Sequence, residues 1–173
     1  GLEGENLEEV SFEGYGPGGI AIMVESMTDN NNRTVAEVRH AFTKSGGNLG
    51  TNGSVSYLFE KKGIITVSSE NDADEVMEIS IEAGAEDIEI NEDESVTVSS
   101  TPEDFENIKK ALSDKEIKID DSEISLVPET TVQADLDTSL KVFKLLEMLE
   151  DLDDTQNVTS NIEFAEGMLD QLD

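Results

Sequence analysis

The side chains best suited to bind a charged partner are the cationic ones between positions 33 and 44. This stretch holds both arginines and the only histidine of the chain, together with one lysine: Arg33, Arg39, His40 and Lys44. Guanidinium and ammonium groups bind phosphate oxygens, so these side chains could form a local site for an anion. The alternative is that they are ordinary solvated charges.

A loop rich in glycine and asparagine follows the cationic stretch. Gly46, Gly47, Gly50 and Gly53 would let a partner approach the backbone closely. The amides of Asn48 and Asn52 could add hydrogen bonds to that partner. The alternative is a helix end followed by a plain connection into a hairpin.

A second glycine cluster formally matches a dinucleotide-binding motif. Gly14, Gly16 and Gly19 have the spacing GxGxxG. That motif binds a pyrophosphate only where it opens a helix, whereas here Pro17 interrupts it and the strand-like run 20–25 follows. We therefore expect Gly14, Gly16, Pro17 and Gly19 to form a structural turn.

Catalytic and metal chemistry have little support in the sequence. The chain contains no Cys, which excludes thiolate zinc sites, disulfides and Cys nucleophiles. His40 could act as a general base, but no Ser or Asp stands in a triad arrangement with it. The acidic runs 91–94 and 151–154 lack the central Gly of an EF-hand. We expect no enzyme activity, no metal and no cofactor.

The charge balance restricts the partners. The 173 residues carry 11 Lys and Arg against 41 Asp and Glu, a net charge of −30. Most of the excess lies after residue 62. Such a chain repels nucleic acid at long range, although screening over about 8 Å lets a local basic patch act. No apolar run approaches the length of a membrane span, and no signal peptide is visible. These features favour a cytoplasmic protein, or a mitochondrial one if the source is a eukaryote.

Hydrophobic periodicity indicates alternating strands and helices. Thr34 and Glu37 form a capping-box pattern that starts a helix ending at Gly46 and Gly47. Thr101 should cap a second helix, with Pro102 at its first position. Further helices are predicted over 74–83 and 136–152. Strands are predicted over 10–12, 20–25, 54–59 paired with 64–67 as a hairpin, 87–90, 95–98, 117–119, 124–127 and 156–164.

This order favours an α+β fold of two small α/β sandwich domains with mainly antiparallel sheets. Residues 1–9 are interpreted as a linker or arm. Residues 10–70 and 131–164 are expected to form a discontinuous, ferredoxin-like first domain. Residues 71–130 would be an inserted α/β domain. Residues 165–173 would form a tail.

Three blocks of the sequence resemble the YebC family. The first is the glycine-rich segment 14–19 (GYGPGG). The second extends from TDN at 28–30 through NRTVAEVRHAF at 32–42 and GGNLG at 46–50 to Gly63. The third is LEDLDD at 149–154, followed by QNV at 156–158. The resemblance covers nearly the whole chain, and the block 14–63 is specific.

The resemblance implies a fold and a function that the periodicity does not show. The family has a small basic helical N-terminal domain and two further α/β domains, and this sequence would begin at the linker after the first. Members are described as probable DNA-binding transcriptional regulators, mitochondrial relatives act as translational activators, and bacterial relatives are also linked to translation. No enzymatic activity is characteristic of the family.

Three functional hypotheses follow. The first is a non-enzymatic, DNA-binding transcriptional regulator of the YebC type. The second is a ribosome-associated translation factor that contacts rRNA or tRNA. In both, most of the nucleic-acid contact would come from the basic N-terminal domain, aided by Arg33, Arg39, His40, Lys44, Asn48 and Asn52. The third is a protein-binding module without nucleic-acid contact.

Overall fold

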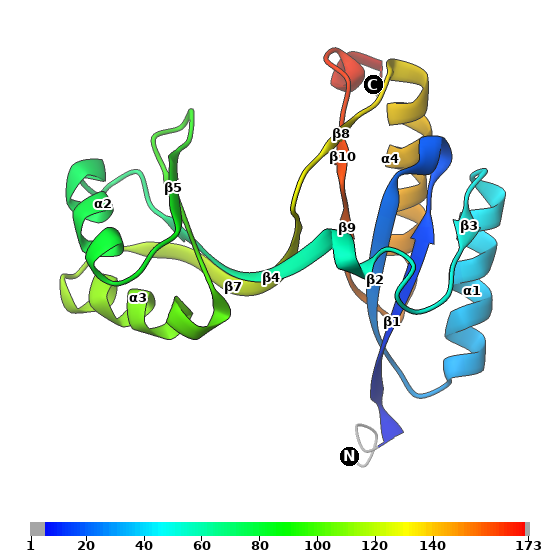
Figure 1. The fold of residues 1–173 in the computed structure, drawn as a ribbon, viewed down its shortest axis with the longest axis horizontal. Coiled ribbons are helices and arrows are strands. Elements are labelled where there is room, and N and C mark those ends of the chain that lie inside the picture. Colours follow the sequence, from blue (N-terminus) through cyan, green and yellow to red (C-terminus); the bar gives the residue numbers. More distant parts are fainter. Residues whose placement is uncertain (1–5, 172–173) are drawn as a thin grey trace. The chain divides into compact units, whose positions relative to one another are not determined.

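The computed structural model describes residues 6–171, which form four α-helices and ten strands (Figure 1). Two compact units share the chain. The first contains residues up to 60 and from 127 onward, and the second contains residues 61–126. The sheets are mainly antiparallel, which confirms the predicted α+β class. Residues 1–5 of the predicted arm and 172–173 of the predicted tail lie outside the described part.

A four-stranded sheet organises the first unit, with strand order β3-β1-β2-β9. β1 (Glu8–Tyr15) and β2 (Ala21–Thr28) form its central antiparallel hairpin. β3 (Asn48–Leu49) pairs antiparallel with the end of β1, and β9 (Thr155–Ser160) pairs antiparallel with β2. Glu8 and Glu9, which fall within the predicted arm, pair with β2 and belong to β1.

Two helices cover this sheet. α1 (Asn31–Lys44) and α4 (Leu136–Glu150) bury an apolar stripe against β2. The fully buried members of this core include Ile22, Val24, Val38, Phe42, Val142, Leu145 and Leu149. Burial of such side chains contributes about 1.5–3 kcal/mol each and holds the helices on the sheet.

The glycine-rich segment forms the turn between β1 and β2, through the short 3-10 helix η2 (Pro17–Gly19). Gly16 N–H donates to the Ile20 carbonyl at 2.7 Å, which closes the turn. Gly18 adopts φ +74°, a conformation that other residues rarely adopt. A side chain at Gly14 would collide with the ring of Phe42. The segment thus shapes the hairpin and leads into a strand.

Smaller elements complete the first unit. β8 (Val132–Gln133) and β10 (Ile162–Glu163) form a two-stranded parallel sheet. The 3-10 helix η4 (Met168–Gln171) follows. The predicted strand 156–164 is therefore split: Asn161 interrupts it, because its side-chain oxygen accepts a hydrogen bond from Ala21 N–H at 3.0 Å.

The second unit is another four-stranded sheet with two helices. Its strand order is β5-β6-β4-β7. The strands are β4 (Phe59–Val67), β5 (Asp87–Ile90), β6 (Val96–Ser100) and β7 (Ile119–Pro128), and the helices are α2 (Ala73–Glu82) and α3 (Pro102–Asp114). Thr101 caps α3 as predicted, accepting from Asp104 N–H. The core contains Ile65, Val98, Ile108 and Leu112.

The predicted hairpin of 54–59 with 64–67 is wrong. Residues 56–58 form the 3-10 helix η3 (Ser56–Leu58), and β4 continues through Gly63 without a turn. Gly63 pairs with Ser100 of β6, where a side chain would collide with Phe105. The glycine that suggested a turn is required for close packing. Likewise, the two strands predicted within 117–127 are the single strand β7.

The predicted capping box of α1 is also wrong. The N-cap is Asn30, whose side-chain oxygen accepts from Arg33 N–H at 3.1 Å. Thr34 lies inside the helix, and its hydroxyl is used in a tertiary contact. Within residues 6–171, no helix has the length and apolar character needed to cross a bilayer.

Candidate nucleic-acid interface

Three of the predicted contact residues lie on the exposed side of α1. Arg39, His40 and Lys44 are all exposed, whereas Val38 and Phe42 on the opposite side are fully buried. Over the described residues, none of the three forms an ion pair or a side-chain hydrogen bond. Their hydrogen-bonding groups are therefore available to a partner.

A groove of about 600 Å³ lies beside Arg39, between α1, β1 and the loop after β3. Val10, Phe12, Val35 and Leu49 supply its apolar surface. Its polar lining includes Asn31, Arg39, Thr51 and Asn52. The structure thus places Arg39 and Asn52, which are 13 positions apart, on one groove.

Asn48 and Asn52 lie on either side of the point where the chain leaves the sheet. Asn48 is exposed in β3, opposite Tyr15 of β1. Asn52 is exposed in the loop that follows. The loop is fixed at its start by the Gly50 N–H, which donates to the Glu13 carbonyl at 2.7 Å. The two amides therefore project from an ordered part of the first unit.

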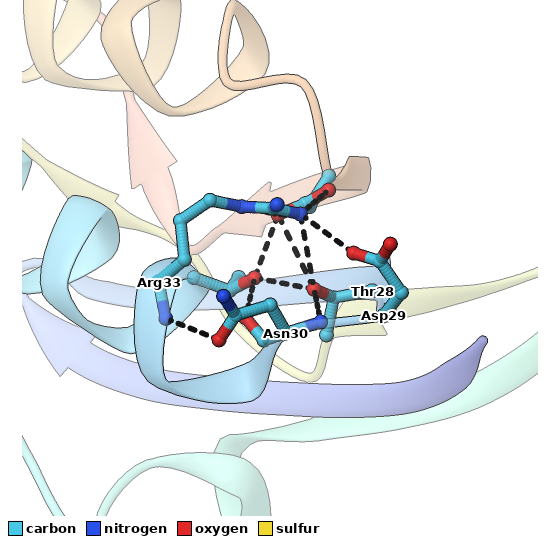
Figure 2. A network of polar contacts seen from close by, with 6 residues as sticks. Thr28, Asp29, Asn30 and Arg33 are labelled. Atoms are coloured by element: carbon cyan, nitrogen blue, oxygen red, sulfur yellow. Dashed lines mark hydrogen bonds and ion pairs between the residues drawn. The ribbon is translucent and has the colours of Figure 1, made fainter. Parts of the chain in front are cut away.

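Arg33 differs from the other cations, because two carboxylates already bind it (Figure 2). Its Nη2 donates to Asp154 Oδ2 at 2.9 Å and Oδ1 at 3.0 Å, and to Asp29 Oδ1 at 3.1 Å. Asp154 lies in the turn between α4 and β9. Arg33 therefore joins the start of α1 to that turn, which gives it a structural role in addition to the predicted contact.

Two buried threonines complete the network around Asp154. Thr34 Oγ1 donates to Asp154 Oδ2 at 2.7 Å, and Thr28 Oγ1 lies 3.3 Å from the same oxygen. The hydrogen bond from Thr34 is the main reason that the pKa of Asp154 lies below its usual value. Partial burial opposes this shift, and the Arg33 guanidinium adds to it.

Glu13 organises the loop beside the groove. Its carboxylate is buried and accepts backbone hydrogen bonds from Gly53 at 2.9 Å, Val55 at 3.0 Å and Ser56 at 2.8 Å. Burial alone would raise the pKa of Glu13, but these N–H groups stabilise the anion and the pKa is lowered. Tyr15 adds a bond from its hydroxyl to the Ser54 carbonyl at 3.0 Å.

Sequence reasoning missed Glu13, Thr28 and Asp154 as organising residues. In the sequence, Glu13 follows the apolar Phe12, and this alternation predicts a side chain that faces solvent. Asp154 belongs to an acidic run. No local signal distinguishes these carboxylates from the other acidic residues. Their partners lie 40 or more positions away, as with Gly53 for Glu13 and Thr34 for Asp154.

Metal binding finds no candidate in the described part of the chain, since no three His, Asp or Glu side chains there are arranged to hold an ion. In the acidic turn 91–94, Asp93 instead accepts hydrogen bonds from the backbone and hydroxyl of Ser95. These two hydrogen bonds lower the pKa of Asp93, and the bond from the Ser95 hydroxyl has the larger effect.

Fold and site together define an α+β protein of two compact units, one of which presents an exposed cationic helix beside a groove. A family profile described as "TACO1/YebC second and third domain" matches residues 7–162. The chain belongs to the TACO1/YebC family, as the resemblance predicted.

Relatives and a solved structure agree with this assignment. A protein of Francisella philomiragia named "Probable transcriptional regulatory protein" is 54% identical over 172 residues, which are 99% of this chain and 69% of that protein. A protein of the same name from Nitrosococcus oceani is 53% identical over 171 residues, with the same coverage. The crystal structure of the conserved hypothetical protein Aq1575 from Aquifex aeolicus superposes with a TM-score of 0.86. The two sequences are 48% identical, and the matched region covers 98% of this chain and 70% of the Aq1575 chain.

Proposed function

We propose that this protein is a non-enzymatic regulator of gene expression that contacts nucleic acid through the exposed side of α1. The names of its relatives support a role as a regulator, and the family is named for regulation rather than for a catalytic activity. DNA is the first candidate, because those names refer to transcription. We place its action in the cytoplasm, as the relatives reported above are bacterial.

The observation that carries the proposal is the free state of Arg39 and Lys44. Most cations of the chain are neutralised by a carboxylate: Arg33, Lys62, Lys109, Lys110, Lys118 and Lys141 all form ion pairs. Arg39 and Lys44 have no such partner among the described residues and lie on one helix with His40. A phosphate would supply the missing anions.

The net charge of −30 sets the conditions under which such contact can occur. Repulsion by the whole chain weakens at physiological salt, since the field is screened over about 8 Å. Direct contacts by Arg39 and Lys44 are also weakened by salt, through counterion release. The interface should therefore be small and rely on amide and backbone contacts in addition to charge, which Asn48 and Asn52 can supply.

The experiment is a fluorescence-anisotropy titration of a labelled 20-base-pair DNA duplex with the 173-residue chain, at several salt concentrations. The test variant is Arg39→Glu with Lys44→Glu. The control is Lys110→Glu with Lys115→Glu, which changes the net charge by the same amount in the second unit. We expect the test variant to lose at least about tenfold in affinity, or about 1.4 kcal/mol, and the control to lose much less.

Equal losses in the two variants would show that only the total charge matters and would overturn the assignment to α1. The same titration with an RNA duplex, and co-sedimentation with ribosomes, distinguish the nucleic-acid class. Binding of ribosomes without DNA binding would replace the DNA assignment by the translation hypothesis. Absence of all three would overturn nucleic-acid contact by this chain.

A further inference from the structure

One edge of the first sheet is open for most of its length. β3 pairs with β1 only at Gly14 and Tyr15, and Gly50 extends this pairing to the Glu13 carbonyl. Before Glu13, β1 has no backbone partner on this side among the described residues. Since main-chain groups alternate along a strand, Glu9 and Ser11 direct their N–H and C=O to the same side as Glu13. These four groups have no backbone partner within residues 6–171.

The groove described above runs along this open edge. Val10, Ser11 and Phe12 of β1 form one side of it, and Asn31, Val35 and Arg39 of α1 form the other. It lies where β3 would continue if the chain did not turn away at Gly50. An added strand would bond to Glu9 and Ser11 and would place alternate side chains on the apolar surface of Val10, Phe12 and Val35.

The closed end of the groove is held in place by hydrogen bonds within the protein. Three backbone N–H groups of the following loop bond to the Glu13 carboxylate, and Gly50 bonds to its carbonyl. A binding surface that is already ordered costs less conformational entropy to occupy. Binding of an extended segment would therefore cost little conformational entropy on the side of the groove.

The charges along the edge favour a binding segment with basic residues at one end. Glu8 and Glu9 are exposed at the open end, and no ion pair engages them among the described residues. α1 begins shortly after Thr28, which pairs with Glu8 at the open end of the edge. The chain that follows α1 passes Tyr15 at Gly47, at the closed end. Arg39, just past the middle of α1, therefore lies nearer the closed end than Asn31 and Val35 do. A matching strand carries basic residues only at the Glu8 end.

A second copy of the chain is a poor occupant. Two chains of charge −30 repel each other. In a symmetric pairing centred on Ser11, Glu9 would also face Glu13 of the other copy, and like charges opposed across strands are destabilising.

We propose that the open edge of β1 binds an extended segment of a basic partner protein, which adds to the sheet antiparallel to β1. The segment has apolar side chains at alternate positions and basic residues at its C-terminal end, beside Glu8 and Glu9. This interaction goes beyond the proposed nucleic-acid contact, because it uses main-chain groups of β1 and carboxylates, whereas nucleic acid would use cations of α1.

The probe is an acetylated, amidated and labelled peptide, Thr-Val-Thr-Val-Thr-Lys-Lys, titrated with the chain by fluorescence anisotropy. Ser11→Pro removes an outward N–H at a position where an edge strand tolerates proline. We expect it to weaken binding at least about tenfold, the equivalent of one or two lost hydrogen bonds. Ser11→Ala retains the N–H and should bind as the unmodified chain does. Amide resonances of Glu9 and Ser11 should shift on binding.

Three further measurements keep the test decisive if Ser11→Pro does not fold. A peptide with a methylated backbone nitrogen at the second of its three threonines, which lies opposite Ser11, should bind at least about tenfold more weakly to the unmodified chain. A peptide with its lysines moved to the N-terminal end should also bind more weakly, as should Glu8→Gln with Glu9→Gln toward the original peptide.

The proposal is overturned if no peptide binds, if Ser11→Pro and the methylated peptide bind normally, or if sedimentation shows that the edge pairs with a second copy. Lys44→Glu, at a position outside the groove lining, should retain peptide binding while weakening nucleic-acid binding. The two proposals can therefore fail independently of each other.

Discussion

Arg33 and Asp154 are 121 positions apart in sequence, and the guanidinium of one binds both carboxylate oxygens of the other, at 2.9 and 3.0 Å from Nη2. The side chain of Asp154 is only 12% exposed, and that of Arg33 is 44% exposed. The pair links the beginning of α1 to the turn between α4 and β9. Figure 2 shows Arg33 with its hydrogen-bonding neighbours. An arginine that a sequence reading assigns to a partner is therefore also part of the protein's own structure.

Replacing Asp154 should destabilise the first unit. Asp154→Ala removes the acceptor of Thr34 and Thr28, whose residues are 1% and 0% exposed. The two hydroxyls keep each other and Asn30 as partners, so what is lost is hydrogen bonding to a charged acceptor. Such bonds contribute about 1.5–3 kcal/mol, and the free energy of unfolding should fall by about that amount. Urea unfolding followed by tyrosine fluorescence measures it, because both tyrosines, Tyr15 and Tyr57, lie in the first unit. An unchanged midpoint would show that the network contributes nothing.

Replacing Glu13 should loosen the loop beside the groove. In Glu13→Gln, an NH₂ group would face backbone N–H donors, so at least one of the three bonds is lost. We expect a decrease of about 1–3 kcal/mol in unfolding free energy and faster amide hydrogen exchange at Gly53, Val55 and Ser56. Glu9→Gln, the same change at an exposed position of the same strand, is the control. Equal exchange in both variants would contradict the assigned role.

Glu13 should also make stability depend on pH. Its pKa in the folded chain is lowered, so its contribution is complete above the unfolded-state value of about 4.3 and is lost as pH falls through the lower folded value. Between pH 5 and pH 3, the unfolding free energy should therefore decrease more steeply in the unmodified chain than in Glu13→Gln. Parallel curves for the two proteins would show that Glu13 is not the titrating group.

Gly47 should tolerate no side chain. A Cβ there would collide with the Tyr15 carbonyl and lie 3.0 Å from Gly16 Cα, and both are backbone atoms that cannot rotate away. Gly47→Ala should cost about 1–3 kcal/mol or more. Its neighbour Gly46 has φ +87° and no atom of the described residues within 4 Å of a Cβ. Gly46→Asn should therefore remain near the stability of the unmodified chain, since Asn adopts this conformation readily. Similar losses at both positions would contradict this account.

The division into two domains, which we retain as a proposal, can be tested through the second core. Leu112 is fully buried in the second unit. Leu112→Ala should lower the stability of that unit by about 2–5 kcal/mol, as followed by hydrogen exchange of β6. If the units unfold separately, the tyrosine signal of the first unit should keep its midpoint. A common shift of both signals would show one cooperative unit instead.

The helices could be predicted closely because their signals are local. Thr101 caps the start of α3 and Pro102 occupies its first position, so both mark the beginning of the helix locally. In α4, the spacing of the apolar residues matches the side of the helix that is buried. The hairpin prediction failed for the opposite reason. Gly63 has the composition of a turn, yet a strand continues through it because Phe105, 42 positions away, needs the space of its missing side chain.

The candidate site divides in the same way. Arg33 and Arg39 look alike in the sequence, as two arginines at the beginning and middle of one helix. One is bound by Asp154 and the other lines a groove with Asn52. Similarly, Glu13 is one of 41 acidic residues in the sequence. It is buried and hydrogen-bonded only because the loop after β3 folds back over it and donates backbone N–H groups to its carboxylate.

The sequence by itself determined the α+β class, the family and the place of the cationic helix, because composition, periodicity and motif spacing are properties of neighbouring residues. Only the tertiary structure decided which cations are neutralised, which edge of the sheet stays open and which carboxylate holds a loop. Those outcomes depend on contacts between residues 40 to more than 100 positions apart, such as Glu13 with Gly53 and Arg33 with Asp154. Chain folding brings these partners together, and no short segment of the sequence specifies them.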